Sequence, residues 1–282
     1  MTGTSAPSQK AGGIPASRMW QDLYWGNLAR EQARGWIAVL PLAAIEQHGP
    51  HLPLGTDAMI AEAFVRRVLV LLGEDVPAIF LPAQNVTLST EHVAYPGTLT
   101  LPASAAIAAW TAIGESVARA GIRKLVMVTS HGGNSAAMDI VAQDLRARLG
   151  MLVVTTSWLR FGAPAGLFDP EEIKHGIHGG DVETSLMLAA APNHVRMDKA
   201  EDFLPASRDM VDGFTWLNAH RPAGFAWQAQ DLHPSGAIGN AANASADKGD
   251  ALLHHGANAF CDLLKDVQNF DLARLGHAPK PT

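Results

Sequence analysis

Residues 36–58, WIAVLPLAAIEQHGPHLPLGTDA, combine a strand pattern with an unusual set of polar side chains. The apolar run 36–42 is typical of a fully buried strand. Four carboxylates and imidazoles then follow within twelve residues: Glu46, His48, His51 and Asp57. Such groups are costly to bury unless they are paired or bind a cation. The segment therefore predicts a core strand that delivers charged groups to a site at its carboxyl end.

Apolar runs of this kind alternate with helical patterns along the chain. The expected strands are 36–42, 76–83, 124–130 and 151–158. The expected helices are 56–73, 102–121, 135–149, 181–191 and 245–268. Strands that are apolar throughout and alternate with helices predict an α/β fold. In such a fold, helices cover both faces of a parallel sheet.

Three segments lack a regular pattern. Residues 159–181 are rich in Gly, Pro and His and are expected to be mostly loop. Residues 203–244 form a long irregular stretch, which in a compact domain is typical of a lid or an oligomer contact. The opening residues 1–18 have no apolar block and predict a flexible arm rather than a signal peptide. With no internal repeat and no linker, residues 19–282 are expected to form a single domain.

The composition of the 282 residues is that of a globular protein, with 48% hydrophobic and 17% charged residues. The formal net charge of −6 argues against a nucleic-acid partner. No stretch reaches about 18 uninterrupted apolar residues, so no membrane partner is expected. The lone Cys261 excludes an intrachain disulfide and suits a reducing compartment. We therefore expect a cytoplasmic protein.

Polar side chains gather at the carboxyl ends of two predicted strands, where parallel sheets place their sites. Glu46 and His48 follow the first strand and point to the same side if the chain stays extended. His131 follows the third strand in TSHGGN (129–134), where glycines permit close approach to a ligand. The simpler alternatives are a helix cap for Asp57 and hydrogen-bonded loop residues for His48 and His131. The convergence of N and O ligands at neighbouring strand ends favours a metal site.

A third polar group lies in HGIHGGDVETS (175–185). His178 and Glu183 lie five residues apart, in a loop that leads into a predicted helix. His175 and His178 are difficult to explain as core residues in a glycine-rich loop. For Glu183, the simpler alternative is a favourable interaction with the helix dipole. Glu, Asp and His without Cys are ligands that suit Zn²⁺, Mn²⁺ or Fe²⁺.

Four motifs, EQHGPHLPLGTD, PGTLTL, SHGGN and HGGDVETS, resemble those of the creatininase (creatinine amidohydrolase) family in order and spacing. The resemblance extends from about residue 36 to 270 and includes AWQAQDLHPSGAIGNAANASADKG. It implies a three-layer αβα sandwich with a mostly parallel sheet and a dinuclear metal centre. It also implies a hydrolase that acts on non-peptide C–N bonds of small molecules, and commonly a homohexamer.

Carried over residue by residue, the resemblance implies five metal ligands. Glu46 and His131 would hold one ion, His48 and Glu183 would hold the other, and Asp57 would bridge the two. The two divalent ions are expected to be Zn²⁺, with Mn²⁺ or Fe²⁺ as alternatives.

Further residues are assigned to the substrate. His178 matches the catalytic histidine of the family, which transfers a proton to or from the substrate. Glu91 and His92 in STEHVAYPGT are expected to line the pocket beside the metals. Backbone N–H groups near Gly132 and Gly133 are expected to face the developing oxyanion.

Two positions depart from creatininase itself. Gly133 stands where that enzyme has a carboxylate, and Lys174 stands where it has a tryptophan. The loss of both groups argues against creatinine as the substrate, while Lys174 is a candidate contact for an anionic substrate group. The SHGGN form is instead shared with formamide deformylases and with the mycofactocin-precursor peptidase. A metal-dependent deformylase or peptidase of this family is therefore the alternative function.

Two other classes of protein fit the residues less well. A non-catalytic metal-binding protein would not need the intact ligand set. A serine hydrolase based on Ser130 and His131 is disfavoured, because adjacent strand residues point to opposite sides and no G-x-S-x-G elbow is present. The expectation is an amidohydrolase with two metal ions, a small-molecule amide substrate and a homo-oligomeric state.

Overall fold

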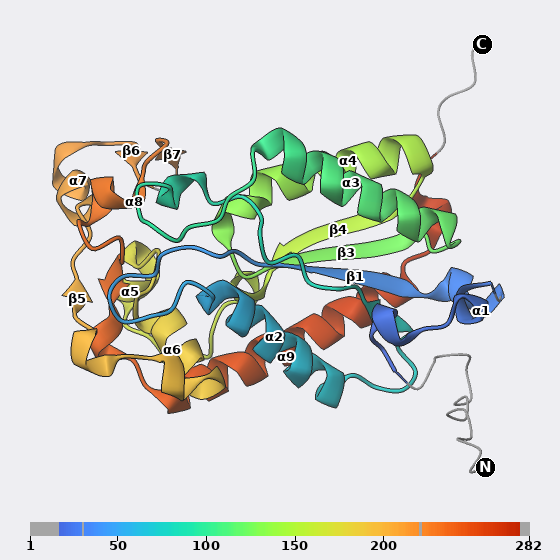
Figure 1. Ribbon diagram of the computed structural model, residues 1–282, viewed down its shortest axis with the longest axis horizontal. Helices are drawn as coiled ribbons and strands as arrows, with labels where there is room; N and C mark the ends of the chain where they lie inside the picture. Colours follow the sequence, from blue (N-terminus) through green and yellow to red (C-terminus); the bar gives the residue numbers. More distant parts are fainter. Residues whose placement is uncertain (1–16, 30, 220–221, 277–282) are drawn as a thin grey trace.

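A four-stranded parallel sheet forms the centre of the protein (Figure 1). The computed structural model describes residues 17–29, 31–219 and 222–276. The strand order is β2-β1-β3-β4. The strands are β1 (Ile37–Leu42), β2 (Ala78–Phe80), β3 (Lys124–Thr129) and β4 (Leu152–Ser157). Strand β2 is shorter than its apolar pattern because prolines flank it on both sides.

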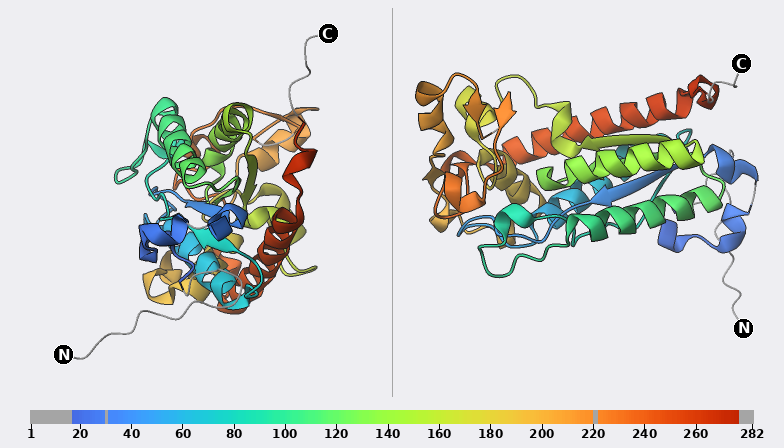
Figure 2. Two further views of the ribbon diagram at one scale, coloured as in Figure 1. Left: turned by 90° about the vertical axis from the view of Figure 1, so that its right-hand side faces the viewer. Right: turned by 90° about the horizontal axis from the view of Figure 1, so that it is seen from above.

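Helices cover both faces of this sheet (Figures 1 and 2). One layer contains α3 (Ala103–Arg119) and α4 (Ser135–Leu149). The other contains α2 (Thr56–Leu71) and the long helix α9 (Ala246–Asn269), with α6 (Asp181–Ala190) packed against both. The predicted three-layer α/β sandwich with a parallel sheet is confirmed.

The strands are apolar throughout because each face of the sheet packs against a helical layer. Ile37 and Val39 point into the core beneath α2 and α9, whereas Ala38 and Leu40 point into the core beneath α3 and α4. Alternate residues of a strand face opposite sides, so a strand with two covered faces needs apolar side chains at every position.

The register of the sheet decides where the site lies. In the β1–β3 pair, Leu42 lies opposite Thr129, so both strands end at the same edge. The polar segments that begin at Glu46 and His131 therefore leave the sheet side by side.

The two segments expected to be irregular contain short elements. Helix α5 (Pro170–His175) interrupts 159–181, a segment that otherwise is mostly loop, as expected. Its start has a regular cap, because the Asp169 side chain accepts a hydrogen bond from the Glu171 N–H and Pro170 occupies the first turn. The remaining short elements are α1 (Trp25–Leu28), β5 (Asp202–Phe203), α7 (Ser207–Gly213), β6 (Leu217–Asn218), β7 (Ala223–Gly224), α8 (Ala229–Leu232) and β8 (Gly239–Asn240).

The predicted arm 1–18 is only partly accessible to comparison, since residues 1–16 lie outside the described residues. Arg18 does not belong to a flexible arm. Its guanidinium donates hydrogen bonds to the carbonyls of Gly73, Val76 and Ala78, which fastens it beside β2. Within the described ranges, no helix combines the length and the apolar character that crossing a membrane requires.

Candidate metal centre

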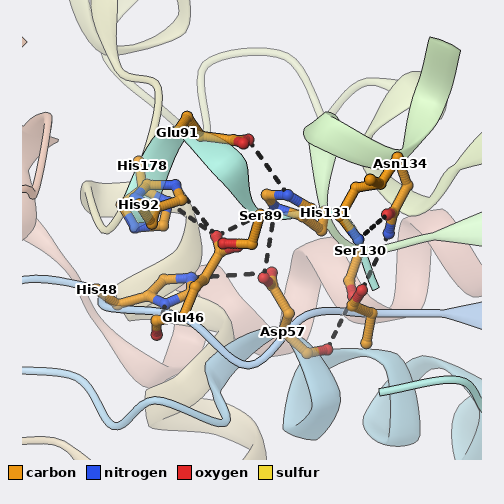
Figure 3. Close-up of polar contacts among 12 residues, drawn as sticks. Glu46, His48, Asp57, Ser89, Glu91, His92, Ser130, His131, Asn134 and His178 are labelled. Atoms are coloured by element: carbon orange, nitrogen blue, oxygen red, sulfur yellow. Dashed lines mark hydrogen bonds and ion pairs between the residues drawn. The ribbon is translucent and has the colours of Figure 1, made fainter. Parts of the chain in front are cut away.

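Glu46, His131 and Asp57 converge at the carboxyl ends of β1 and β3 (Figure 3). His131 Nδ1 lies 3.1 Å from Glu46 Oε1 and 3.7 Å from Asp57 Oδ2. One potential ligand atom from each residue lies within 4.8 Å of the other two. All three side chains are buried.

A second cluster joins Asp57 to His48 and Glu183. His48 Nε2 lies 3.8 Å from Asp57 Oδ1 and 3.8 Å from Glu183 Oε2. Glu183 belongs to the first turn of α6, and its Oε2 accepts a 2.6 Å hydrogen bond from the Gly179 N–H. Gly179 has a φ of +62°, and a Cβ there would lie 3.3 Å from the carbonyl of His48. Glycine at this position therefore lets the α6 segment approach His48 closely.

Asp57 is common to both clusters, and its two carboxylate oxygens point in different directions. Oδ1 faces His48 and Oδ2 faces His131. Asp57 does not cap helix α2, because Gly55 is the N-cap residue and no side chain caps that end. The structure thus offers a physical role for Asp57 other than capping, namely a carboxylate that serves two sites.

The segment around Glu46 is held by the PGTLTL motif. The Leu99 N–H donates to the carbonyl of Ile45 (2.9 Å), and the Gln47 N–H donates to Thr98 Oγ1 (3.3 Å). These bonds continue an extended conformation past the end of β1. As a result, Glu46 is directed toward His131 rather than toward solvent.

The donor set fits divalent cations. Glu46, Asp57 and Glu183 form their ion pairs among the described residues with histidines only. Several of the facing atoms are buried and have no hydrogen-bond partner within the described part of the chain: Glu46 Oε1 and Oε2, His48 Nε2 and Asp57 Oδ2. Ligands about 2.0–2.2 Å from a tetrahedral ion lie about 3.3–3.6 Å apart. The observed separations of 3.1–3.8 Å are close to this range.

Burial and the neighbouring charges shift the pKa values of the groups in the two clusters. Burial raises the pKa of Asp57 well above its usual range, and the Glu46 carboxylate adds to this. Burial opposes ionisation of Glu46 as well, but the charge of His131 outweighs it and lowers the pKa of Glu46. Burial lowers the pKa of His48, and His178 lowers it further, which favours the neutral imidazole that binds metals. A site of this kind requires compensating positive charge.

His178 lies at the centre of a stack of imidazoles. Its ring centroid is 4.1 Å from that of His48 and 4.2 Å from that of His92. Its Nε2 donates a 2.5 Å hydrogen bond to the carbonyl of Gln47, and its Nδ1 lies 3.6 Å from Glu46 Oε1. A ligand atom of His178 also groups with Glu46 and His48 within 4.8 Å. In the structure, His178 therefore lies against the two clusters rather than at a distance from them.

Gln47 is a site residue without a predicted role. Its Nε2 donates to His92 Nδ1 (2.7 Å) and to the carbonyl of Gly236 (3.0 Å), while His92 Nε2 lies 3.4 Å from Glu46 Oε1. Gln47 therefore fixes the orientation of the buried His92 ring against Glu46. Its position between Glu46 and His48 was the only sequence signal for this role.

The other predicted substrate residues lie at different places. Glu91, in the 3₁₀ turn Thr90–His92, has its Oε1 3.3 Å from His131 Nε2. Gly132 and Gly133 lie in the exposed 3₁₀ turn that follows His131. Lys174 is an exposed residue of α5.

Two further histidines from the quoted motifs do not join the clusters. His51 is buried, with its Nε2 2.9 Å from Thr184 Oγ1 and its ring stacked on Phe203. His175 belongs to helix α5 and is buried, so for this histidine the expectation that it is difficult to explain as a core residue is wrong. The N-cap at Asp169 starts a helix that turns His175 inward.

A cavity of about 450 Å³ adjoins the second cluster. His178 and Glu183 form part of its wall. Most of the remaining wall is apolar and includes Leu159, Pro164, Phe168, Ile173, Ile177 and Leu252. Lys174 is not part of this wall. The cavity is therefore a mostly apolar chamber that reaches the carboxylate and imidazole groups.

Replacement of the shared carboxylate is expected to affect both clusters. Asp57→Ala should lower the metal content of both, whereas His48→Ala should lower that of one. Metal analysis of the purified variants measures this directly. Two ions per chain in Asp57→Ala would show that Asp57 does not bridge.

Replacement of Asp57 by its neutral isostere asparagine is expected to change the Tm of the metal-free and the metal-loaded protein in opposite directions. Burial raises the pKa of Asp57, so at neutral pH the metal-free chain loses stability by burying this carboxyl group. Asp57→Asn removes that cost, and the Tm of the metal-free protein should rise by about 2–4 °C for each 1 kcal/mol gained. The same change should lower the Tm of the metal-loaded protein. Thermal unfolding with and without a chelator measures both, and a lower Tm in both states would contradict the expectation.

Comparison with known proteins finds relatives that are named as a peptidase and as an amidohydrolase. The chain is 36% identical over 167 residues to the mycofactocin precursor peptide peptidase of Mycobacterium tuberculosis, over 57% of this chain and 61% of that protein. The matched part thus spans about three fifths of the length of that relative. It is 28% identical over 262 residues to the creatinine amidohydrolase of Pseudomonas putida, over 87% of this chain and 95% of that protein.

The comparison with solved structures and the comparison with family models point to the same family. A solved creatininase structure described as the Mn form matches with a TM-score of 0.70 and 26% identity, over 89% of this chain and 98% of that chain. The family model described as creatinine amidohydrolase matches residues 21–264. This range contains all four strands of the central sheet and every residue of the two clusters. The chain therefore belongs to the creatininase family.

Proposed function

We propose that this protein is a dinuclear-metal-dependent amidohydrolase that cleaves a non-peptide C–N bond of a small molecule, such as a cyclic amide or an imide. The observation that carries the proposal is the position of Asp57, whose two carboxylate oxygens face His48 and His131 separately. Membership of the creatininase family and the hydrolase names of the relatives support it.

Each cluster would hold one divalent ion. Glu46 and His131 would hold the first ion, His48 and Glu183 would hold the second, and Asp57 would serve both. Two ions in such a site lower the pKa of a bound water and polarise a substrate carbonyl. Zn²⁺ is the preferred ion for this N and O set, with Mn²⁺ or Fe²⁺ as alternatives. Solved creatininases described as Zn–Zn and Mn forms support the first two metals.

His178 is the proposed proton donor to the departing nitrogen. Because a carbonyl oxygen can only accept a hydrogen bond, the contact with Gln47 places a proton on His178 Nε2. Nδ1 is then the nitrogen that can accept a proton and return it. The backbone N–H of His178 donates to the carbonyl of Ile238, which holds the residue against the cavity.

The cavity indicates which substrates suit the site. Its mostly apolar wall favours a small amide that carries an apolar substituent, with the scissile bond at the end formed by His178 and Glu183. The backbone N–H groups of Gly132 and Gly133 are proposed to face the substrate oxygen. A contact between Lys174 and an anionic substrate gains no support from the wall of this cavity.

A peptidase of the mycofactocin-precursor type is the second candidate function, with a formamide deformylase as a related possibility. The 36% identity to the M. tuberculosis peptidase exceeds the 28% identity to the P. putida amidohydrolase, although it covers a shorter region. The ligand set would be the same in either enzyme, so only the substrate distinguishes them.

We also propose that the protein acts as a homo-oligomer, such as a hexamer, in the cytoplasm. Tyr24, Trp25 and Trp216 are large side chains with exposed fractions of 76%, 85% and 70%. Aromatic side chains are enriched at protein–protein interfaces relative to the rest of the surface. Light scattering of the purified protein measures the number of subunits.

The proposed function is tested by metal analysis followed by a hydrolysis screen. The screen compares cyclic amides, imides, formamides and peptides, each with and without an apolar substituent. Metal-dependent turnover of an amide or imide supports the proposal. Turnover of peptides or formamides alone would favour the second candidate, and two bound ions with no turnover of any substrate would favour a non-catalytic protein.

The proposed role of His178 predicts a loss of rate without a loss of metal. General acid–base catalysis contributes typically 10²–10⁴-fold, so His178→Ala should lower kcat by about that factor. His131→Ala is the comparison, since it should lose both metal and activity. Full kcat in His178→Ala, or a protein stripped of metal, would contradict the assignment.

Creatinine itself is expected to be a poor substrate. Gly133 offers no carboxylate, and the exposed Lys174 offers no aromatic wall. Gly133→Glu should not restore turnover, because a Cβ at this position collides with His131 Nε2. Steady-state assays with the metal-loaded protein check this, and efficient hydrolysis of creatinine by the unmodified chain would refute it.

A further inference from the structure

We propose that Glu91 is a positioning residue whose carboxylate pairs with the outer ring nitrogen of His131 and so orients this ring for metal binding. This inference rests on the proposed function, because it requires that His131 binds a metal. It assigns Glu91 to the metal centre rather than to substrate contact.

The two nitrogens of His131 face different partners. Nδ1 faces the first cluster, 3.1 Å from Glu46 Oε1 and 3.7 Å from Asp57 Oδ2. Nε2 is buried and has no hydrogen-bond partner among the described residues, and the Glu91 carboxylate lies beside it, with Oε1 at 3.3 Å. If Nδ1 binds a metal, the proton of the neutral ring must be on Nε2, where the Glu91 carboxylate can accept it. A carboxylate on the outer nitrogen of a ligating histidine fixes the tautomer and the ring orientation.

Gly133 leaves the space that this contact needs. A Cβ at position 133 would collide with His131 Nε2 and would lie 2.5 Å from Glu91 Oε1. At Gly132, by contrast, a Cβ would meet nothing within 4 Å. The lack of a side chain at position 133 therefore opens a gap that the Glu91 carboxylate enters from another segment.

Buried hydrogen bonds connect the two segments. The Leu88 N–H donates to Asn134 Oδ1 (3.2 Å), and Asn134 Nδ2 donates to Thr129 Oγ1 (3.1 Å). Thr129 Oγ1 in turn accepts from the His131 N–H (3.0 Å). Glu91 follows Leu88 closely in the chain, so this network holds its backbone in register with that of His131. The side chain of Glu91 is only 18% exposed, which limits its other conformations.

The test uses the full chain, stripped of metal by a chelator and titrated with Co²⁺ alone. The readouts are the number of ions bound, their affinities and the visible absorption of each bound Co²⁺. Loss of a carboxylate that contacts the non-ligating nitrogen of a metal-bound histidine lowers the metal affinity about 10–100-fold. Glu91→Ala should therefore weaken one of the two sites by about that factor and alter its Co²⁺ spectrum, with the other site unchanged.

The conservative variant separates positioning from other roles. Glu91→Gln keeps an oxygen that can accept the hydrogen bond, so it should recover most of the affinity and the original spectrum. Val93→Ala, an exposed residue close to Glu91 in the chain, is the matched control and should bind Co²⁺ like the unmodified protein. Equal unfolding temperatures of the metal-free variants exclude a general loss of structure.

Variants of Gly132 and Gly133 test the contact between Glu91 and His131 independently, from the segment that carries His131. Gly133→Ala should weaken Co²⁺ binding at the same site, whereas Gly132→Ala should leave the affinity unchanged. Equal affinities in these two variants would contradict the proposed gap.

Two results would overturn the inference while the proposed function stands. In one, Glu91→Ala binds two Co²⁺ ions with unchanged affinities and spectra. In the other, both Glu91 variants lose one ion completely, which would make Glu91 a direct ligand. Failure of the unmodified chain to bind any Co²⁺ would overturn the proposed function as well.

Discussion

The burial of the Asp57 carboxylate between two histidines is the constraint on which the site depends. This carboxylate is 1% exposed, and each of its oxygens faces one imidazole. Glu46 and Glu183 add two further carboxylates to the same volume, and none of the three pairs with Lys or Arg among the described residues. Packing alone cannot stabilise such a group of charges, because desolvation raises the pKa of Asp57 and of Glu183 in spite of the histidines around them. In the proposed function, cations in the two clusters would supply the missing charge, and the surrounding structure would hold the ligands for them.

The parallel sheet provides that support through its register. Because β1 and β3 end together, Glu46 and His131 leave the sheet as neighbours, and the start of α2 brings Asp57 beneath both. Loop segments around the strand ends hold these residues in position through hydrogen bonds. Residues 96–101 pair with the chain beside Glu46, and Asn134 connects the ends of three segments. Polar side chains of this kind fix a ligand set more precisely than apolar packing does, since each hydrogen bond has a preferred direction.

Most of the fold could be predicted from the sequence, because it follows from local patterns. The four apolar runs and five long helical patterns all correspond to elements of the structure, with ends displaced by a few residues. The structure adds features that the sequence patterns do not predict where a single local contact outweighs the composition of a segment. Asp169 caps a helix inside a segment rich in Gly and Pro, and the Arg18 guanidinium binds three carbonyls beside β2. A pattern summed over many residues cannot detect a single cap or a single guanidinium.

The sequence by itself determined the element order, the two-sided burial of the sheet and the residues that gather at the site. Those features follow from apolar periodicity and from the cost of burying charge, which act along the chain. Only the tertiary structure decided how the gathered residues face one another. It directs the two oxygens of Asp57 to different histidines, stacks His178 between His48 and His92, and places Glu91 against the outer nitrogen of His131. These contacts join segments far apart in the chain, and their geometry depends on packing that no local pattern encodes.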